Sequence, residues 1–552
     1  MRTTTRAALL FFALTLIAIY PISASPSTAA FFNHPDTQLN MWIMAWDAHA
    51  WRHGLHFLDA NVFWPAHGTF AYSESLLGYL PLFGPILWLG GSLALAFNTV
   101  LIISFVASGL GMYLLTRELT GRQWPAVVAG ILYAFAPYRL AHIPQIQLEA
   151  MEWLPLAFLS LHRFVATGSR RYAAALAACL VLQAFCCVYY AVVLATTLVV
   201  TIVVLGAIDA RARAPRALLT LAVAAAAAAL VLSPLAYAYV HVHRASGLER
   251  TLEDAAERSA DARAYLASIA HTHLAVLDRP HAPHDYLFPG VVALAFATLG
   301  FVVTSPRRTA VYVAVILFAF AVSLGPAENG GPSVYRAMYA VVPLFHGLRQ
   351  ISRFGVVTIF GLSVLAAYGA TASEPFLRGR AGAAAKVFIC VVAFAELLAA
   401  PLKSDGGSGV ALVPVPRTPP EYHWLGRQTG DFAVIELPLP ISARLWQNAP
   451  YVFWSTVHNH PIVNGYSGFA APVYRTWLNT MFRFPDQVSR AMLQDNHVRY
   501  VVVHWDAFTP FDRPLDRSKL DRMMWLHREV TFADTDIFEV LPVDELSTRA
   551  AR

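Results

Sequence analysis

The sequence has few charged residues and almost no lysine. Only 13% of its 552 residues are charged, whereas 57% are hydrophobic. Lysine occurs three times while alanine is abundant, a combination that indicates a high-GC bacterial genome. The formal net charge of +6 comes from arginines in short stretches between apolar runs, so it does not indicate a nucleic-acid partner. The composition predicts a multi-pass protein of the bacterial inner membrane.

The sequence also has few cysteines and contains no nucleotide-binding motif. No Walker pattern and no G-x-G-x-x-G are present, so no nucleotide loop is expected. His271 and His273 lack nearby carboxylates, and we predict no metal site and no cofactor. The cysteines all lie inside apolar runs and give neither a disulfide framework nor a zinc spacing: Cys179, Cys186, Cys187 and Cys390.

The apolar runs predict eleven membrane helices whose inside loops are all basic. The stretch 76–89 contains Pro81, Gly84 and Pro85, and it suits a re-entrant or interfacial piece better than a span. The first run also fits a cleavable secretory signal. The helices are expected at about 7–23, 93–116, 124–137 and 148–165, twice within 172–208, at 217–240, on both sides of Arg307-Arg308, at 354–372, and ending near Pro401.

The composition becomes that of a soluble domain after the glycine-rich stretch 405–409. Short β-branched and aromatic runs predict strands at 433–437, 500–504 and 537–541. Helices are expected at 421–428, 474–482 and 519–528. We therefore predict a transmembrane module at 1–402, whose first extracytoplasmic loop is 24–92, and an α/β-type soluble domain at 403–552. An odd number of helices puts this domain outside the cytoplasm.

A polar stretch at 32–74, between two apolar ones, contains the main catalytic candidate, Asp36. A carboxylate just beyond a membrane helix can accept a proton from an acceptor hydroxyl. Alternatively, Asp36 caps a helix that begins near Thr37, and the two roles are compatible. The neighbouring candidates for substrate binding are His34, Gln38, Asn40 and Glu74. Asp47 and Asp59, like Glu74, are weaker catalytic candidates and are expected to be solvated loop residues or caps.

Three further segments carry candidate ligands. In the loop 138–149, Arg139, His142 and Gln147 could bind a sugar or phosphate. Interfacial snorkelling explains Arg139 and His142 nearly as well. Tyr189 and Tyr190 suit a sugar platform or an aromatic belt. Arg349 and Arg353 would share a face on a helix and could bind a lipid-linked phosphate or anionic headgroups. The loop 458–468 could bind a glycan or be a packed structural loop.

The pattern resembles the GT-C superfamily of polytopic glycosyltransferases. The resemblance rests on Asp36 in the first outside loop, on the basic turn 113–122, on 129–137, on Asp-Thr-Gln-Leu-Asn at 36–40 and on Asn-Gly-Tyr-Ser-Gly at 464–468. The sequence departs from the best-known branch at Thr37, where that branch commonly has an acidic residue. The resemblance implies an inverting transfer from a polyprenyl-phosphate sugar, with Asp36 as the base, Arg349 and Arg353 on the donor phosphate, and no obligatory metal.

The leading hypothesis from the sequence is therefore an integral-membrane glycosyltransferase that acts on the extracytoplasmic side. Its expected partners are a lipid-linked sugar donor and membrane lipids, with a glycan, lipid or protein as acceptor. One alternative is a transporter or flippase of lipid-linked saccharides, which the largely apolar spans disfavour. Another is a non-catalytic glycan-binding or assembly protein.

Overall fold

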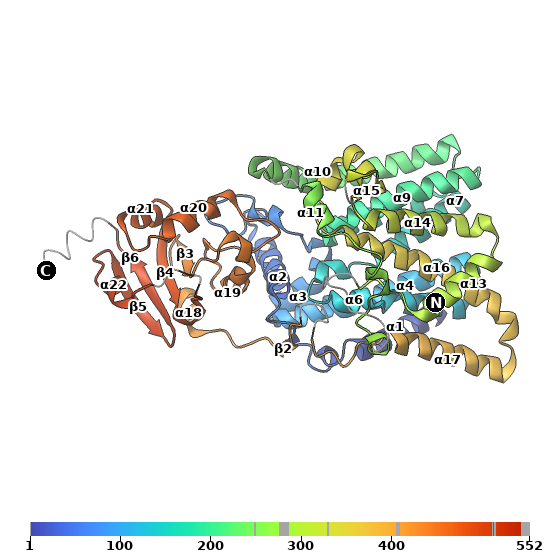
Figure 1. The fold of residues 1–552 in the computed structure, drawn as a ribbon, viewed down its shortest axis with the longest axis horizontal. Coiled ribbons are helices and arrows are strands. Elements are labelled where there is room, and N and C mark those ends of the chain that lie inside the picture. The colour runs from blue at the N-terminus through green and yellow to red at the C-terminus, as the bar shows by residue number, and fades with distance from the viewer. Residues whose placement is uncertain are drawn as a thin grey trace. The chain divides into compact units, whose positions relative to one another are not determined.

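The computed structural model, mainly helical, describes residues 2–247, 250–274, 286–327, 330–404, 409–510, 512 and 515–542 (Figure 1). The chain divides into two compact units, each described by itself below. The first comprises Met1–Phe31, Leu76–Leu235 and Glu249–Val413, and the second comprises Phe32–Ser75, Ala236–Leu248 and Pro414–Arg552. The predicted domain boundary at 402/403 stays a prediction, and 405–408 of the expected linker lie outside the described residues.

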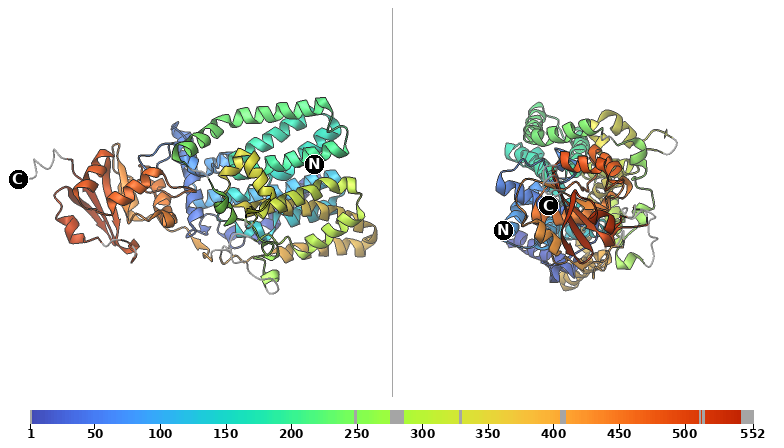
Figure 2. Two further views of the ribbon diagram at one scale, coloured as in Figure 1. Left: turned by 45° about the horizontal axis from the view of Figure 1, so that its top comes forward. Right: turned by 90° about the vertical axis from the view of Figure 1, so that its left-hand side faces the viewer.

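The first unit is a bundle of helices that run side by side (Figure 2). Helix α16 packs against α13 and α14, α4 against α5, and α7 against α8. The long helices are α1 (Arg2–Ala18), α4 (Leu93–Thr120), α5 (Gln123–Ala134), α7 (Trp153–Thr167), α8 (Arg170–Cys186), α9 (Val188–Ile208), α10 (Pro215–Ser246, of which the unit includes the part up to Leu235), α13 (Val291–Val303), α14 (Pro306–Ser323), α16 (Gly355–Ser373) and α17 (Gly379–Leu397). Shorter elements of this unit are β1 (Ala29–Ala30), α3 (Leu80–Trp88), α6 (Pro137–Ala141), α11 (Leu252–Ala256), α12 (His271–Leu274) and α15 (Val334–Val341).

Five of the described helices are long and apolar enough to cross a membrane, namely α4, α9, α10, α14 and α16. The polytopic helical fold is thereby confirmed, while the number of crossings stays a prediction. Helix α3 occupies the apolar stretch at 76–89 and has nine residues. At 1.5 Å per residue it rises only ~14 Å, about half the hydrocarbon thickness. Its length agrees with an interfacial or re-entrant piece.

Basic turns of the bundle contact one another at the helix ends. Arg163 in the last part of α7 forms an ion pair of 2.8 Å with Glu118 near the end of α4. Glu374, just after α16, pairs with Arg122 before α5 and with Lys386 in α17, at 3.4 Å each. Two of the arginines in these ion pairs, Arg122 and Arg163, are predicted from the sequence to lie on the same side of the membrane. The contacts therefore agree with the predicted order of the membrane helices.

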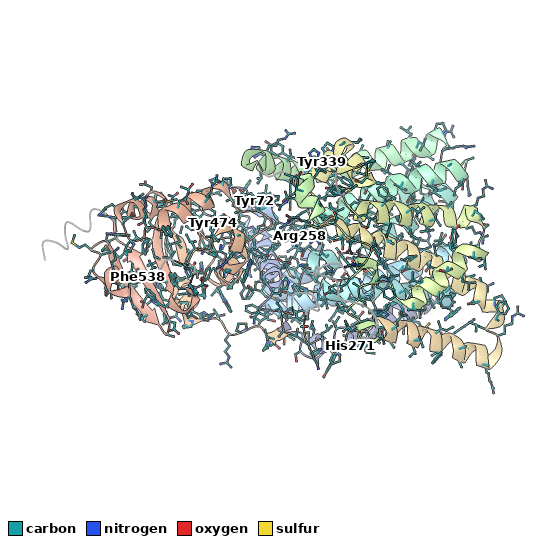
Figure 3. The ribbon with its side chains drawn as sticks, viewed as in Figure 1. Tyr72, Arg258, His271, Tyr339, Tyr474 and Phe538 are labelled. Atoms are coloured by element: carbon teal, nitrogen blue, oxygen red, sulfur yellow. The ribbon has the colours of Figure 1, made fainter. Side chains whose placement is uncertain are left out.

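The second unit contains a four-stranded sheet in the order β3-β4-β6-β5. Strands β3 (Ala433–Leu437) and β4 (Val498–His504) are parallel, whereas β6 (Thr535–Val540) is antiparallel to both β4 and β5 (Leu526–Phe532). The fully buried side chains of Val501, Trp477 and Phe538 contribute to its core (Figure 3). The remaining elements are α2 (Pro35–His53), β2 (Val413–Pro414) at the junction with the first unit, α18 (Pro420–Leu425), α19 (Ala449–His458), α20 (Pro472–Met481), α21 (Gln487–Asp495) and α22 (Arg517–Asp521).

The predicted strands agree with β3, β4 and β6, but the helix expected at 519–528 is wrong. Helix α22 ends at Asp521, and residues from Leu526 onward form β5. The residues of β5 alternate between more and less buried positions, which is the pattern of a strand with one face on the core. The α/β character predicted for this part of the chain is confirmed.

Residues of the predicted first loop are part of the same unit as the C-terminal sheet. The amides of Phe63 and Trp64 donate to the carbonyls of Asn464 and Ile462, each at 3.0 Å. The segment 461–463 in turn pairs with β3, because the amide of Val434 donates to the carbonyl of Pro461 at 2.9 Å. Residues 61–64 thus extend the β3 edge of the sheet, and α19 packs on α2. Two segments nearly 400 residues apart therefore fold together.

Candidate functional site

Asp36 lies in the first turn of α2, which begins at Pro35. The N-cap is His34, whose Nδ1 accepts a hydrogen bond of 3.1 Å from the amide of Asp36. The expectation that Asp36 caps a helix beginning near Thr37 is therefore wrong. Proline at the first helical position explains the earlier start, since its fixed φ suits that position and it has no amide to satisfy. The carboxylate, which is partly buried, does not serve as the cap.

Tyr466 is the partner of the Asp36 carboxylate. Its hydroxyl donates to Oδ1 of Asp36 at 2.7 Å. On the other side, Nδ2 of the fully buried Asn40 donates to the backbone carbonyl of Asp36 at 2.6 Å. A fixed phenol donor on one carboxylate oxygen orients the group, as a general base must be oriented toward the proton that it accepts.

The Asn-Gly-Tyr segment that carries Tyr466 is built into the core. Asn464 is fully buried, and its side chain bonds both the amide and the carbonyl of Glu436 in β3, at 2.8 and 2.9 Å. A Cβ on Gly465 would lie 2.5 Å from the ring of Phe63, so the close approach of these two segments requires glycine. The loop predicted at 458–468 is thus a packed structural loop, and its Tyr466 contacts the catalytic candidate.

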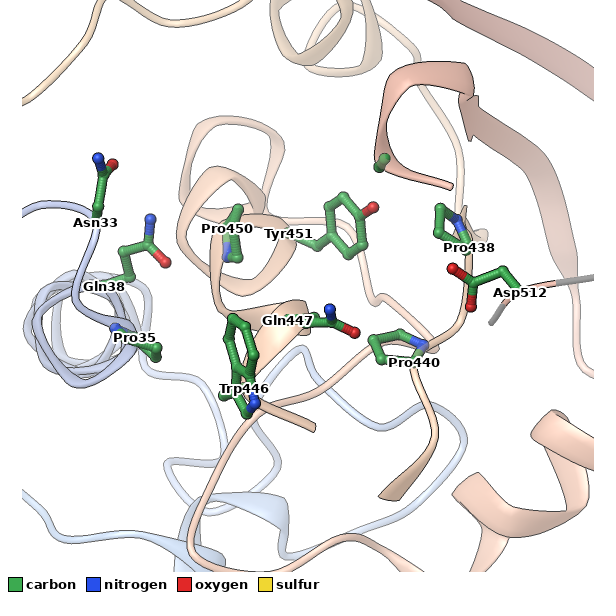
Figure 4. A pocket seen from close by; sticks show the side chains of 11 residues that line it. Asn33, Pro35, Gln38, Pro438, Pro440, Trp446, Gln447, Pro450, Tyr451 and Asp512 are labelled. Atoms are coloured by element: carbon green, nitrogen blue, oxygen red, sulfur yellow. The ribbon is translucent and has the colours of Figure 1, made fainter. Parts of the chain in front are cut away.

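A cavity of about 260 Å³, which we call the proline-lined pocket, lies beside the start of α2 (Figure 4). Pro438 and Pro440 follow β3, and Ala507 follows β4, so the pocket lies at the carboxyl ends of two parallel strands, where open α/β sheets bind ligands. Its lining residues are Asn33, Pro35, Gln38, Pro438, Pro440, Trp446, Gln447, Pro450, Tyr451, Ala507 and Asp512. Two of these, Pro35 and Gln38, flank Asp36 in the sequence.

The other acidic candidates of the first loop have different surroundings. Asp47 is fully buried within α2, so the expectation that it is a solvated residue or cap is wrong. Asp59 accepts a hydrogen bond of 2.7 Å from the amide of Gly68, a structural role in the loop. Glu74 is half-buried between the short 3₁₀ helices at Thr69–Tyr72 and Leu77–Tyr79.

In the first unit, Arg139 belongs to a buried polar network. Its side chain is fully buried, with Nε 2.8 Å from Oε2 of Glu149 and Nη2 3.0 Å from Oγ of Ser104. Ser104 also contacts Glu152, which accepts a hydrogen bond of 2.7 Å from the hydroxyl of Tyr79. An arginine that is paired and hydrogen-bonded inside the protein is better suited to fixing helices than to binding substrate. Its assignment as a substrate ligand stays a prediction.

Aromatic residues link the loop after α6 to the start of α9. His142 stacks on Tyr138 at a ring distance of 4.1 Å, and its Nδ1 lies 2.7 Å from the carbonyl oxygen of Tyr138. The hydroxyl of Tyr138 lies 3.2 Å from that of Tyr190. Close by in the sequence, the buried Oε1 of Gln147 has no hydrogen-bond partner among the described residues. The cluster consists of phenols, an imidazole and an amide, all groups that bind hydroxyls or phosphate.

Arg353 lies against this aromatic cluster. Its guanidinium is 5.0 Å from the ring centre of Tyr189, and the hydroxyl of Tyr189 donates to the carbonyl of Gln350. Within the described part of the chain, Arg353 has no carboxylate partner, and its buried Nε makes no hydrogen bond. The residue sits in a 3₁₀ helix (Ile351–Phe354) that leads directly into α16. An unpaired guanidinium at a helix N-terminus is a suitable place for an anion.

The expectation that Arg349 and Arg353 share a helical face is wrong. Arg349 is exposed in an irregular segment between the 3₁₀ helices Pro343–Gly347 and Ile351–Phe354. Arg349 lies near Arg250. The pKa of Arg250 is lowered mainly by burial and, to a smaller extent, by the positive charge of Arg349. The backbone carbonyl of Arg250 accepts a hydrogen bond of 2.8 Å from the hydroxyl of Tyr339 (Figure 3). Arg349 thus has a cationic neighbour that the sequence did not indicate.

Within the described ranges, no group of three or more His, Cys, Asp or Glu side chains is arranged to hold a metal ion. The candidates fall into two sets. Asp36, His34, Gln38, Asn40 and Glu74 belong to the second unit. The first unit holds the rest: Arg139, His142, Gln147, Tyr189, Tyr190, Arg349 and Arg353.

Comparisons with known proteins show which solved structures have a similar fold. Residues 75–258 match the family model described as "6-pyruvoyl-tetrahydropterin synthase related domain; membrane protein", which covers about a third of the chain. No curated protein matches. The arabinofuranosyltransferase AftD from Mycobacteria is similar in structure, with a TM-score of 0.63 and 15% identity over 98% of this chain and 40% of that one.

A second similar structure is the Archaeoglobus fulgidus oligosaccharyltransferase, with a TM-score of 0.50 and 13% identity over 91% of this chain and 68% of that one. The chain spans less than half the length of the mycobacterial protein. At such low identity the similarity concerns the fold. The chain therefore shares its fold with these two structures, which agrees with the fold that the GT-C resemblance predicted.

Proposed function

We propose that this chain is an integral-membrane glycosyltransferase that moves a sugar from a polyprenyl-phosphate donor to an acceptor on the extracytoplasmic side, with inversion at the anomeric carbon. The observation that carries the proposal is the Asp36 carboxylate, held by Tyr466 at 2.7 Å and flanked in sequence by two residues of the proline-lined pocket. A base must lie within hydrogen-bond reach of the hydroxyl that it deprotonates, and the cavity lined by the neighbours of Asp36 in α2 is a candidate place for that hydroxyl.

In the proposed reaction, Asp36 takes the proton of an acceptor hydroxyl as that oxygen attacks the anomeric carbon. A new glycosidic bond forms while the bond between the anomeric carbon and the phosphate oxygen breaks, and the polyprenyl phosphate leaves with the electron pair. Tyr466 holds the carboxylate through Oδ1. The hydroxyl of Tyr466 is a positioning group here, because it contacts the base and not the reacting atoms.

Arg353 is the proposed ligand of the donor phosphate, with Arg349 as a second cation. Phosphate oxygens gain negative charge as the glycosyl bond breaks, and a fixed guanidinium stabilises that charge. The support for this role is the lack of a carboxylate partner for Arg353 in the described residues, together with its position before the N-terminus of α16. The neighbouring Tyr189 contributes an aromatic face.

The comparisons support the proposal at a coarser level. The two similar structures are named as an arabinofuranosyltransferase and an oligosaccharyltransferase, both of which transfer sugars. Another structure of the archaeal enzyme is described as a complex with an inhibitory peptide and a dolichol phosphate. That description makes a lipid-linked phosphate a reasonable donor to test first.

The test is sugar transfer by the purified chain in liposomes that contain a polyprenyl-phosphate sugar. Asp36→Asn keeps the size of the side chain but removes the base, so transfer should fall by about 10²–10⁴. Its folding should change little, because His34 provides the cap. The matched control is Asp495→Asn, an exposed carboxylate of the same unit, which should leave transfer unchanged. The buried Asp47 is unsuitable as a control.

Near-parental transfer by Asp36→Asn would remove the catalytic assignment. A parent protein that transfers nothing but moves lipid-linked sugar between leaflets would favour the flippase alternative. A parent that only binds glycans would favour the assembly alternative. Scrambling of a fluorescent lipid-linked sugar, measured in the same liposomes, distinguishes these outcomes.

A further inference from the structure

The proline-lined pocket has the chemistry of a site for a neutral polyol. Three of its lining side chains, Asn33, Gln38 and Gln447, are amides, each of which can both donate and accept hydrogen bonds. Among the described residues that line the pocket there is no lysine or arginine, and Asp512 contributes a carboxylate. Hydroxyl groups would find both donors and acceptors among the described lining residues, whereas an anion would meet no cationic side chain among them.

Trp446 gives the pocket an apolar platform. About half of its side chain is exposed (51%), in the 3₁₀ helix Ser442–Asn448. In the view of Figure 4, Trp446 and Gln447 lie between the α2 residues Pro35 and Gln38 and the prolines that follow β3. The C–H face of a sugar ring can stack on such an exposed indole face. The amides can meanwhile hydrogen-bond the hydroxyls at the ring edge.

The walls around this platform are rigid. The carbonyl of Pro440 accepts a hydrogen bond of 2.8 Å from the buried hydroxyl of Tyr474, which fixes the segment after β3 (Figure 3). Tyr451, which also lines the pocket, stacks on His504 at a ring distance of 5.0 Å. Prolines and buried aromatic rings lose little freedom when a ligand binds, so such a site is pre-organised.

We propose that the proline-lined pocket binds one neutral saccharide ring of the acceptor, stacked on Trp446. This inference rests on the proposed function and deepens it, because it selects a glycan over a lipid or protein as acceptor. The volume of about 260 Å³ is just below the ~300–1,000 Å³ typical of small-molecule pockets, which suits a single ring. Two of the lining residues, Pro35 and Gln38, belong to the first turn of α2, which also contains Asp36.

The test measures binding of methyl glycosides of neutral hexoses and pentoses to the full chain in detergent, by saturation-transfer difference NMR. Asp36→Asn serves as the background, so that binding is followed without turnover. At least one glycoside should saturate the site. Trp446→Ala should weaken it about tenfold or more, and Trp446→Phe should weaken it less, because a smaller aromatic face remains. Trp51→Ala is the matched control, since Trp51 is also exposed (66%), belongs to the same unit and does not line the pocket.

Equal affinity of Trp446→Ala and the parent would overturn the inference, as would the absence of saturable binding by any glycoside of the panel. Trp446-dependent binding of an unglycosylated peptide, with no glycoside bound, would overturn it too. If Trp446→Ala does not fold, Gln447→Ala replaces it, with an expected loss of about threefold or more. Transfer assays test the proposed function separately: transfer that depends on Asp36 without glycoside binding leaves that function intact and removes only the saccharide site.

Discussion

Tyr466 is the residue whose hydroxyl should matter most to Asp36 without touching the substrate. Tyr466→Phe removes only the oxygen that donates to Oδ1 at 2.7 Å and keeps the ring in place. A hydrogen bond to a charged group contributes about 1.5–3 kcal/mol, so we expect kcat to fall about tenfold or more. The donor KM should stay near the parental value, because the donor phosphate is not bound there. A rise in donor KM with unchanged kcat would assign Tyr466 to substrate binding.

Arg353 should act on the donor instead. Arg353→Ala removes an unpaired guanidinium, and we expect the donor KM to rise about tenfold or more with a smaller effect on kcat. Arg353→Lys keeps the charge but loses the planar fork, so it should restore part of the affinity. Arg349→Ala should have the smaller effect of the two, because Arg349 is exposed. Steady-state kinetics over a range of donor concentrations checks all three variants. Unchanged donor kinetics in Arg353→Ala would favour general headgroup binding.

Single positions differ in how well the sequence predicts them. The sequence marked Asp36 because it is a carboxylate just beyond a membrane helix, and in the structure its neighbours Pro35 and Gln38 line a cavity. Tyr466 was not assigned to it, since the two residues are 430 positions apart and only tertiary packing brings them together. The Asn-Gly-Tyr-Ser-Gly pattern was the available signal. The sequence did not indicate a role for Trp446, because a single exposed tryptophan in a short 3₁₀ helix is not part of any hydrophobic periodicity.

At the scale of elements, the Asn464–Tyr466 segment joins β3 to the first-loop residues. Gly465→Ala would place a methyl group 2.5 Å from the ring of Phe63. Overpacking of this kind costs ~1–3 kcal/mol, so the melting temperature should fall by several degrees. The same variant should lower kcat, because the displaced loop carries Tyr466. Gly430→Ala is a useful comparison: Gly430 lies in a turn at φ +113° with nothing closer than 3.9 Å, so its cost should be backbone strain without loss of kcat. A stable, fully active Gly465→Ala protein would contradict the packing described for this loop.

The end of α19 should make the stability of the chain pH-dependent. Burial, with a smaller contribution from His460, lowers the pKa of His458 to about 3, whereas an unfolded histidine has a pKa of about 6.5. Between these values the unfolded chain binds a proton that the folded chain does not, so stability falls as the pH falls from about 7 toward 3. The slope from this residue approaches ~1.4 kcal/mol per pH unit.

Melting temperatures between pH 7.5 and 5 test this slope. His458→Asn keeps an acceptor for the amide of His460, which now bonds Nδ1 of His458 at 3.0 Å, but it does not titrate in this range. The variant should therefore lose less stability on acidification than the parent. His423→Asn, at an exposed position, should behave like the parent. Parallel melting curves for the parent and His458→Asn would show that His458 does not control the acid response.

At the scale of the whole chain, the helices were the most predictable part. Long apolar runs and arginine-rich turns mark them, and the helices α4, α9, α14 and α16 begin within a few residues of the expected positions or flank the expected loops. It was harder to predict which segments form the second unit. The hydrogen bonds between 61–64 and 461–464 join segments that are far apart in the sequence. Sequence order suggested a loop followed much later by a domain, whereas the structure combines them.

That combination gives a prediction about membrane topology. Because Phe32–Ser75 and Pro414–Arg552 fold as one compact unit, they must lie on the same side of the membrane, which the basic inside loops predict to be the extracytoplasmic side.

Single cysteines can report this in a Cys390→Ala background, since the other three native cysteines are buried. His53→Cys and Asp495→Cys, both exposed and one in each segment, should react with a membrane-impermeant maleimide in intact cells. Arg213→Cys, in a predicted inside turn, should react only after permeabilisation. Different labelling of positions 53 and 495 would contradict the shared unit. Protection of both in intact cells would reverse the orientation and, with it, the proposed side of sugar transfer.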